Sequence, residues 1–227
     1  MPIAIDPSFS VFHLTEKVQQ GSTLLNHRRT MSLVSYEIEN ATLIDQARTR
    51  IFAGFQYFSK FMRQLSRYTN LALRAESVYV FGVPDVRPPA LPNITYVPLQ
   101  RTDHLAKEWF LVSYGRDYVS ALATEELTRI SDPDQERVFK GIWTFDHAMV
   151  SILQQWLTST VDARALGFEE TDLNYERQVL LMSRTLGRLT GRMERLQAKA
   201  ASQPDRHPEE LKIAINAGMS SAPPPKS

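Results

Sequence analysis

The stretch IFAGFQYFSKFMRQLSRY, residues Ile51–Tyr68, decides how the fold is built. Its first residues are apolar and typical of a short strand, whereas the following apolar residues recur at offsets of three and four, as in an amphipathic helix. The next apolar run, SVYVFGV at Ser77–Val83, has the composition of a strand that is buried on both faces. A strand, a helix and a second strand within about 30 residues predict a right-handed parallel crossover.

Gly54 stands where this strand is expected to turn into the helix, a place where many α/β proteins hold a phosphate. A dinucleotide-binding loop needs the pattern G-x-G-x-x-G, and a P-loop needs Gly-Lys followed by Ser or Thr. Here Gly54 is followed by Phe55, Gln56, Tyr57 and Phe58. Because bulky rings would block the close approach of a phosphate, we expect Gly54 to let the chain turn while Phe55 and Phe58 fill the core.

The composition narrows the class of protein. The chain has 227 residues, of which 43% are hydrophobic, and this suits one globular domain with an extension. Its 26 basic and 25 acidic residues give no general reason to expect nucleic acid or an anionic membrane as partner. The absence of cysteine excludes disulfides and thiolate chemistry. No signal peptide or apolar run of about 18 residues is found, so a soluble cytoplasmic protein without membrane insertion is expected.

The remaining patterns predict further helices and strands. We expect a lead helix within residues 1–21, capped by Ser8 or Ser10, a helix over 30–46 and a helix after its cap Asp146 with Ile152 facing inward. Strands are expected at four segments, ITYVPL, EWFLVSYG, YVSALATEE and RVFKGIWTFD, with a hairpin around Gly115. The predicted fold is α/β, with a mixed, mostly parallel-containing sheet flanked by helices.

The C-terminal part of the chain has a different pattern. Apolar residues alternate by four and three and predict a long, coiled-coil-like helix; they are Tyr175, Val179, Met182, Leu186, Leu189, Met193, Leu196 and Ala200. The predicted domains are a lead helix at 1–21, an α/β domain at 22–165, this helix at 166–200 and a flexible tail at 201–227.

No constellation of residues indicates catalysis. The five histidines form no H-x-x-x-H or HExxH pattern, and no G-x-S-x-G motif is present. The pair Asp146-His147 resembles that of metal phosphohydrolases, but a capping Asp beside a surface His explains it more simply. We therefore expect neither an enzyme nor a metal site, and the sequence indicates no particular cofactor.

Aromatic residues gather at the predicted strands and could line a pocket for a planar ligand, although a large aromatic core would need the same residues. The candidate ligand-binding residues are Phe55, Gln56, Phe81, Trp109 and Trp143. The long helix supplies candidates for partner binding, which are Met182, Arg184, Leu186, Arg188, Leu189, Arg192 and Met193. Its arginine stripe could also meet phosphates, but a solvated face explains the stripe more simply.

Six segments together resemble the DICT family, a sensory domain of diguanylate cyclases and two-component systems. They lie between residues 22 and 162 and are TMSLVSYEIENATL, IFAGFQYFSKFMRQLSRY, SVYVFGVPD, LPNITYVPL, EWFLVSY and VFKGIWTFD. The resemblance implies a sensory role, often in cyanobacterial signalling and sometimes linked to light. The chain resembles a stand-alone member, because no output domain is recognisable.

The leading hypothesis is a non-catalytic signalling protein that acts by binding a ligand or a protein partner. The C-terminal helix would dock or dimerise, so the expected partners are proteins of a signalling pathway, with a homodimer as one option. The alternative is a receptor for a small planar ligand or pigment in an aromatic-lined pocket. A third hypothesis, less favoured, is a DNA-binding regulator that uses Arg184, Arg188 and Arg192.

Overall fold

The structure is a computed structural model that describes residues 5–18, 24–129, 132–133, 136–161, 164–168 and 170–201. The chain divides into two compact units, Met1–Leu189 and Thr190–Ser227. The expected helix end at Gly21 and the expected flexible tail from residue 202 onward lie outside the described residues.

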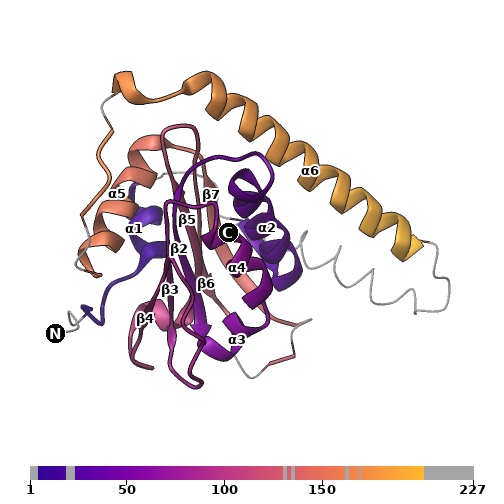
Figure 1. The fold of residues 1–227 in the computed structure, drawn as a ribbon. Coiled ribbons are helices and arrows are strands. Elements are labelled where there is room, and N and C mark those ends of the chain that lie inside the picture. Colours follow the sequence, from indigo (N-terminus) through magenta and orange to yellow (C-terminus); the bar gives the residue numbers. More distant parts are fainter. Residues whose placement is uncertain are drawn as a thin grey trace, which may run out of the picture. The chain divides into compact units, whose positions relative to one another are not determined.

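Seven strands of the first unit form one sheet in the order β1-β7-β6-β5-β2-β3-β4 (Figure 1). The strands are β1 Leu24–His27, β2 Arg50–Tyr57, β3 Ser77–Val83, β4 Ile94–Pro98, β5 Glu108–Tyr114, β6 Val119–Glu126 and β7 Val138–Thr144. β2, β3 and β4 run parallel, and the other neighbours are antiparallel. The mixed α/β sheet is thus confirmed, with parallel pairing confined to β2, β3 and β4.

Helices cover both faces of this sheet (Figure 1). One apolar core lies under α1 and α5, and a second lies under α2, α3 and α4. A long helix, α6, follows α5. The helices are α1 Val11–Val18, α2 Arg28–Leu43, α3 Phe58–Met62, α4 Leu65–Ala72, α5 His147–Ser159 and α6 Tyr175–Ala201, with short 3-10 turns η1 His104–Lys107 and η2 Glu170–Asp172.

The predicted caps are confirmed at two helices. The backbone N–H of His13 donates to the Ser10 hydroxyl at 2.9 Å at the start of α1. At α5, the Asp146 carboxylate accepts from the Met149 N–H at 2.7 Å. The direction of one side chain on α5 was predicted wrongly, because Ile152 is 42% exposed whereas Val150 is buried.

The predicted single helix over residues 58–68 is wrong. The chain forms α3 and α4 instead, separated at Arg63 and Gln64. The N–H of Gln64 donates to the Phe61 carbonyl at 2.7 Å, a tight turn that changes the direction of the helix. Phe61 and Tyr68 then meet edge to face, with ring centroids 5.4 Å apart. Aromatic packing against the sheet therefore overrides the helical periodicity of the sequence.

Gly54 does not turn the chain, contrary to expectation. It lies inside β2, which continues to Tyr57 and has an irregular register between Gly54 and Tyr57. A Cβ atom at Gly54 would lie 2.4 Å from the Phe110 ring, so the absence of a side chain makes room for that ring. The local change in direction occurs at Gln56, whose φ is 44°. β2 thus presents Phe55 to the α2–α4 face before it ends.

Replacing Gly54 with alanine is expected to lower the free energy of unfolding by about 1–3 kcal/mol, because the added methyl group overlaps the buried Phe110 ring. Urea denaturation would measure the loss. Gly167→Ala is the matched control, since a Cβ atom added at Gly167 would meet no neighbouring group within 4 Å. Equal midpoints for the two variants would contradict this explanation of Gly54.

Candidate ligand pocket

A pocket opens between α2, the end of β2, the α3–α4 turn and β5. It encloses about 700 Å³ between atoms, a volume that includes the open solvent at its mouth. The side chains on its walls include Tyr36, Glu39, Phe55, Tyr68 and Trp109. Because α2 and the sheet both contribute walls, the pocket depends on the tertiary fold and not on one local motif.

Three of the five predicted ligand-binding residues, Phe55, Gln56 and Trp109, line this pocket together. The Phe55 ring packs edge to face on Tyr68, with centroids 5.3 Å apart. The guanidinium carbon of Arg28 lies 5.9 Å from the centroid of the Trp109 ring. The pocket thus combines aromatic walls with polar and charged groups.

The other two predicted residues, Phe81 and Trp143, do not line the pocket. Phe81 is fully buried in the core under α1 and α5, on the other face of the sheet, where it packs on Phe110. The Trp143 indole N–H donates to the Ser120 hydroxyl at 2.9 Å, and its ring packs on Phe145.

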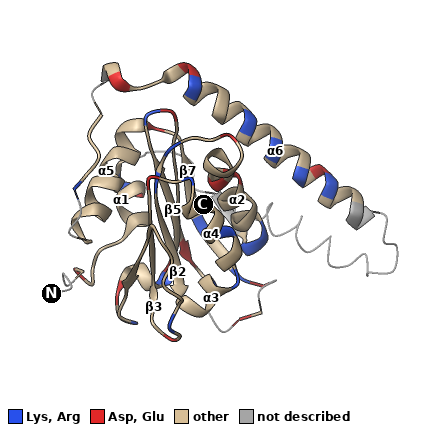
Figure 2. Cartoon of the chain, in the orientation of Figure 1, with Lys and Arg blue, Asp and Glu red and all other residues tan. Residues whose placement is uncertain are grey.

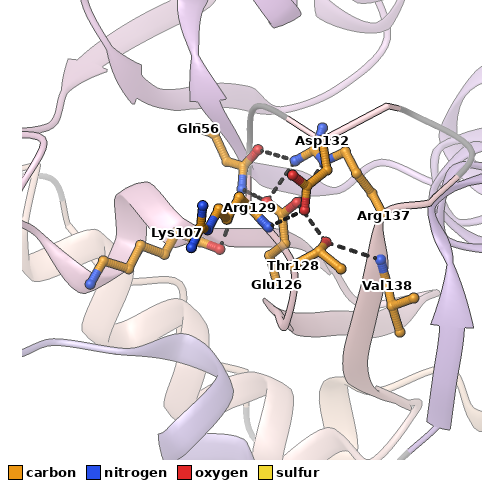
Figure 3. A network of polar contacts seen from close by, with 8 residues as sticks. All are labelled: Gln56, Lys107, Glu126, Thr128, Arg129, Asp132, Arg137 and Val138. Atoms are coloured by element: carbon orange, nitrogen blue, oxygen red, sulfur yellow. Dashed lines mark hydrogen bonds and ion pairs between the residues drawn. The ribbon is translucent and has the colours of Figure 1, made fainter.

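Gln56 belongs to a buried polar network beside the pocket (Figure 3). Its amide NH2 donates to Glu126 at 2.8 Å, and its carbonyl oxygen accepts from Arg137 at 2.8 Å. Arg137 also donates twice to Glu126, at 2.6 Å each, in a bidentate pair in which both side chains are at least 96% buried. This network fixes the backbone at the positive-φ position of Gln56 and ties β2 to β6 and to the start of β7.

Glu39 supplies a carboxylate to the wall of the pocket. Burial raises the pKa of Glu39, although the ion pair and hydrogen bond with Arg67 and the hydrogen bond from Tyr68 counteract this. The Arg67 guanidinium also lies over the Tyr36 ring, 4.7 Å from its centroid. Sequence reasoning missed Glu39, Tyr36 and Arg137; a signal for Glu39 was an acidic residue within the apolar pattern of the predicted 30–46 helix.

α6 contacts the domain through a different face from the predicted heptad seam. Leu181 and Thr185 are fully buried, whereas Val179 is 65% exposed and Leu186 is 45% exposed. Leu189 packs at the edge of the α2–α4 core, and Met182 is half-buried. The heptad residues of α6 that were predicted to bind a partner are thus mostly exposed within the first unit.

Basic residues recur along α6 (Figure 2), and two of the three candidate arginines meet carboxylates of the same chain. Arg188 Nε lies 2.6 Å from Glu37 Oε2, and its Nη1 lies 2.8 Å from Asp45 Oδ2. Arg184 Nη1 lies 3.2 Å from Asp45 Oδ1. The remaining candidates, Arg192 and Met193, belong to the second unit.

Two kinds of feature are absent from the described residues. These residues contain no group of three or more His, Asp or Glu side chains placed to hold a metal ion. Within the same part of the chain, no helix has the length and apolar character needed to cross a membrane.

An α/β domain with a mixed sheet and an aromatic pocket is therefore the class that the fold defines. The family model of DICT, described as a sensory domain in diguanylate cyclases and two-component systems, matches residues 8–127. The chain belongs to this family, and the matched part is a sensory domain of signalling proteins. No curated protein and no solved structure matches the chain.

Proposed function

We propose that the chain is a sensory protein whose input is a small planar molecule bound in the pocket between α2 and the sheet. The observation that carries this proposal is the convergence of Phe55, Gln56 and Trp109, from two different strands, on one pocket. Ligand pockets in proteins are typically aromatic and apolar with a few placed polar groups. The family supports a sensory role, and the pocket supplies a place for the signal.

α2 offers a physical link between this pocket and α6. One side of α2 places Ser35, Tyr36 and Glu39 on the pocket wall. Another side places Glu37 against Arg188 of α6. A ligand that changes the position of α2 would therefore change the attachment of α6, and this is the output that we propose.

Protein purified from its native cells tests the proposal directly. Native mass spectrometry and an absorption spectrum should show a small molecule bound to a detectable fraction of the protein. A colourless protein with no additional mass, and no thermal shift with a library of planar compounds, would contradict it.

Replacing Phe55 with alanine is expected to abolish binding of the co-purifying molecule while lowering the free energy of unfolding by about 1–2 kcal/mol. The ring is half-buried at the pocket wall, so its removal disturbs the core less than the loss of a fully buried ring. Native mass spectrometry and urea denaturation give the two readouts. Phe58→Leu is the control, because Phe58 is buried outside the pocket and this variant should keep the ligand.

A second candidate function is docking or dimerisation through α6. The specific observation is the exposed apolar stripe of the first unit, made by Tyr175, Val179 and Leu186. Size-exclusion chromatography with light scattering on the full chain and on Val179→Asp/Leu186→Asp tests it. A dimer that the double variant makes monomeric supports the candidate, and a monomer at all concentrations contradicts it.

A further inference from the structure

We propose that the ligand of this pocket is an uncharged planar molecule with a ring carbonyl. Its carbonyl oxygen accepts a hydrogen bond from the Ser35 hydroxyl, and its rings lie against Phe55 and Trp109. The inference rests on the proposed function and adds both the chemical class of the ligand and a residue that recognises it. Four features carry it, namely a buried hydroxyl without a partner, occupied acceptors on the wall, paired buried charges and the aromatic surfaces.

Ser35 lies on the pocket wall together with Tyr36 and Glu39 of the same helix, α2. It is 6% exposed, yet its hydroxyl oxygen makes no hydrogen bond with the residues that the structure describes. Buried hydroxyl groups on helices usually donate to the carbonyl four residues earlier, as Thr15 and Thr158 do in this chain. Because leaving a buried hydroxyl unpaired is unfavourable, a ligand in the pocket is the partner that Ser35 lacks.

The buried acceptors of the wall are already occupied. Each carboxylate oxygen of Glu39 accepts a hydrogen bond from another side chain, and so does the amide oxygen of Gln56. Tyr36 adds a second donor to the wall, since its hydroxyl accepts from the Gln64 amide at 2.9 Å and keeps its own hydrogen to donate. The hydroxyl hydrogens of Ser35 and Tyr36 thus match an acceptor on the ligand, which a carbonyl oxygen supplies.

The buried charges of the wall are paired within the protein. The Glu39 carboxylate forms an ion pair with Arg67, and Arg137 forms its bidentate pair with Glu126. A charged group that reached Ser35 would lose its hydration beside groups whose charges are already compensated, whereas a carbonyl avoids this cost. The other basic side chains of the wall already have interactions of their own and are assigned no part in the recognition; they are Arg28, Lys60 and Arg63.

The aromatic surfaces account for the planar body of the ligand. Phe55 and Trp109 come from neighbouring strands, β2 and β5, and offer apolar surface to a flat molecule. Each ring is held by a further ring, since Phe55 packs edge to face on Tyr68 and Trp109 packs edge to face on Phe139, with centroids 5.3 Å and 5.7 Å apart. Planarity is therefore selected by the strands, and the carbonyl by α2.

Three flat probes separate the contribution of the carbonyl from that of the rings. Coumarin and 1-methylindole are uncharged two-ring molecules of similar size, and only coumarin carries a carbonyl. Probes of this size are expected to bind with a Kd on the order of 1 mM, which ligand-observed NMR and calorimetry can measure. We expect coumarin to bind about fivefold more tightly than 1-methylindole, the effect of one neutral hydrogen bond. Coumarin-3-carboxylate, which adds a charge to the same rings, should bind about tenfold more weakly than coumarin.

Matched variants locate the carbonyl at Ser35. Ser35→Ala should weaken coumarin about fivefold and leave 1-methylindole unchanged, while the thermal midpoint stays the same or rises, because no hydrogen bond of the free protein is lost. Ser113→Ala is the control, since the Ser113 hydroxyl is also buried and also lacks a hydrogen bond among the described residues but lies outside the pocket. This control should bind both probes as the parent chain does, whereas Phe55→Ala should weaken both.

The outcomes are distinguishable. The ring-carbonyl class is overturned, while the pocket remains a receptor, if the two uncharged probes bind equally or if Ser35→Ala does not weaken coumarin more than 1-methylindole. Binding of coumarin-3-carboxylate as tight as that of coumarin, or tighter, overturns the uncharged class. If no probe binds at concentrations well above about 1 mM, the ligand class and the proposed receptor function both fail. Ser35→Ala with a lowered thermal midpoint and unchanged affinity would show that the hydroxyl serves the fold and not a ligand.

Discussion

Replacing Arg137 with methionine is expected to lower the free energy of unfolding by about 3–5 kcal/mol. The Arg137 and Glu126 side chains are 2% and 4% exposed and form a bidentate pair. Without Arg137, Glu126 would keep hydrogen bonds from Gln56 and Thr128, but its charge would remain buried without a cation. Desolvation of that carboxylate would then be uncompensated, which is the reason for the large loss.

Urea denaturation at neutral pH measures this loss, and an exposed pair provides the control. Arg116 and Asp172 form an ion pair with side chains that are 59% and 38% exposed. Arg116→Met should therefore change the free energy of unfolding by less than about 1 kcal/mol. Similar losses for Arg137→Met and Arg116→Met would show that burial does not determine the strength of the Arg137 pair.

The order of the elements could be predicted because it depends on local patterns. The apolar runs at Ser77–Val83 and Glu108–Tyr114 became β3 and β5, and the crossover between β2 and β3 became a parallel pair. The periodicity at residues 58–68 misled, since the chain forms two helices there and the rings of Phe61 and Tyr68 pack edge to face across the break. A helical repeat records which residues are apolar, whereas the position of the break depends on the surface against which they pack.

The pocket was predictable in part for a similar reason. Phe55 and Gln56 follow the glycine that marks β2, and Trp109 begins an apolar run, so their positions on strands could be inferred. The pairing of Arg137 with Glu126 and Gln56 joins positions up to 81 residues apart, and no local pattern contains this information. The same holds for Arg188, which the sequence suggests for a partner but which the fold places against Glu37.

Replacing Arg188 with methionine is expected to detach the first turns of α6 from the domain at a cost of about 3–5 kcal/mol in local stability. Burial lowers the pKa of Arg188, but its hydrogen bonds and ion pairs with Asp45 and Glu37 raise it overall, so the side chain is charged. The Glu37 side chain is fully buried, and Asp45 is 5% exposed. Loss of Arg188 removes the ion pair of the buried Glu37 and leaves Asp45 with the longer pair to Arg184, at 3.2 Å.

Hydrogen exchange of the backbone amides at Leu181 and Thr185 measures this detachment, because both residues belong to α6 and their side chains are buried when α6 is attached to the domain. Arg184→Met is the control, since the Arg184 side chain is 47% exposed and pairs with Asp45 at 3.2 Å. This variant should change the opening free energy obtained from hydrogen exchange by less than about 1 kcal/mol. Unchanged exchange in Arg188→Met would contradict the role given to the ion pairs.

The double variant Arg188→Met/Glu37→Leu distinguishes the loss of ion pairing from the loss of the other contacts of the arginine side chain. If the loss in Arg188→Met comes from a buried carboxylate without a cation, removing that carboxylate should restore much of the protection, because a buried ion pair can be replaced by apolar residues at little cost. If the loss comes from the contacts of the arginine side chain itself, the second substitution should add to the first. Restored protection would show that the attachment of α6 is electrostatic. A small displacement of α2 that separates Glu37 from Arg188 could then release α6.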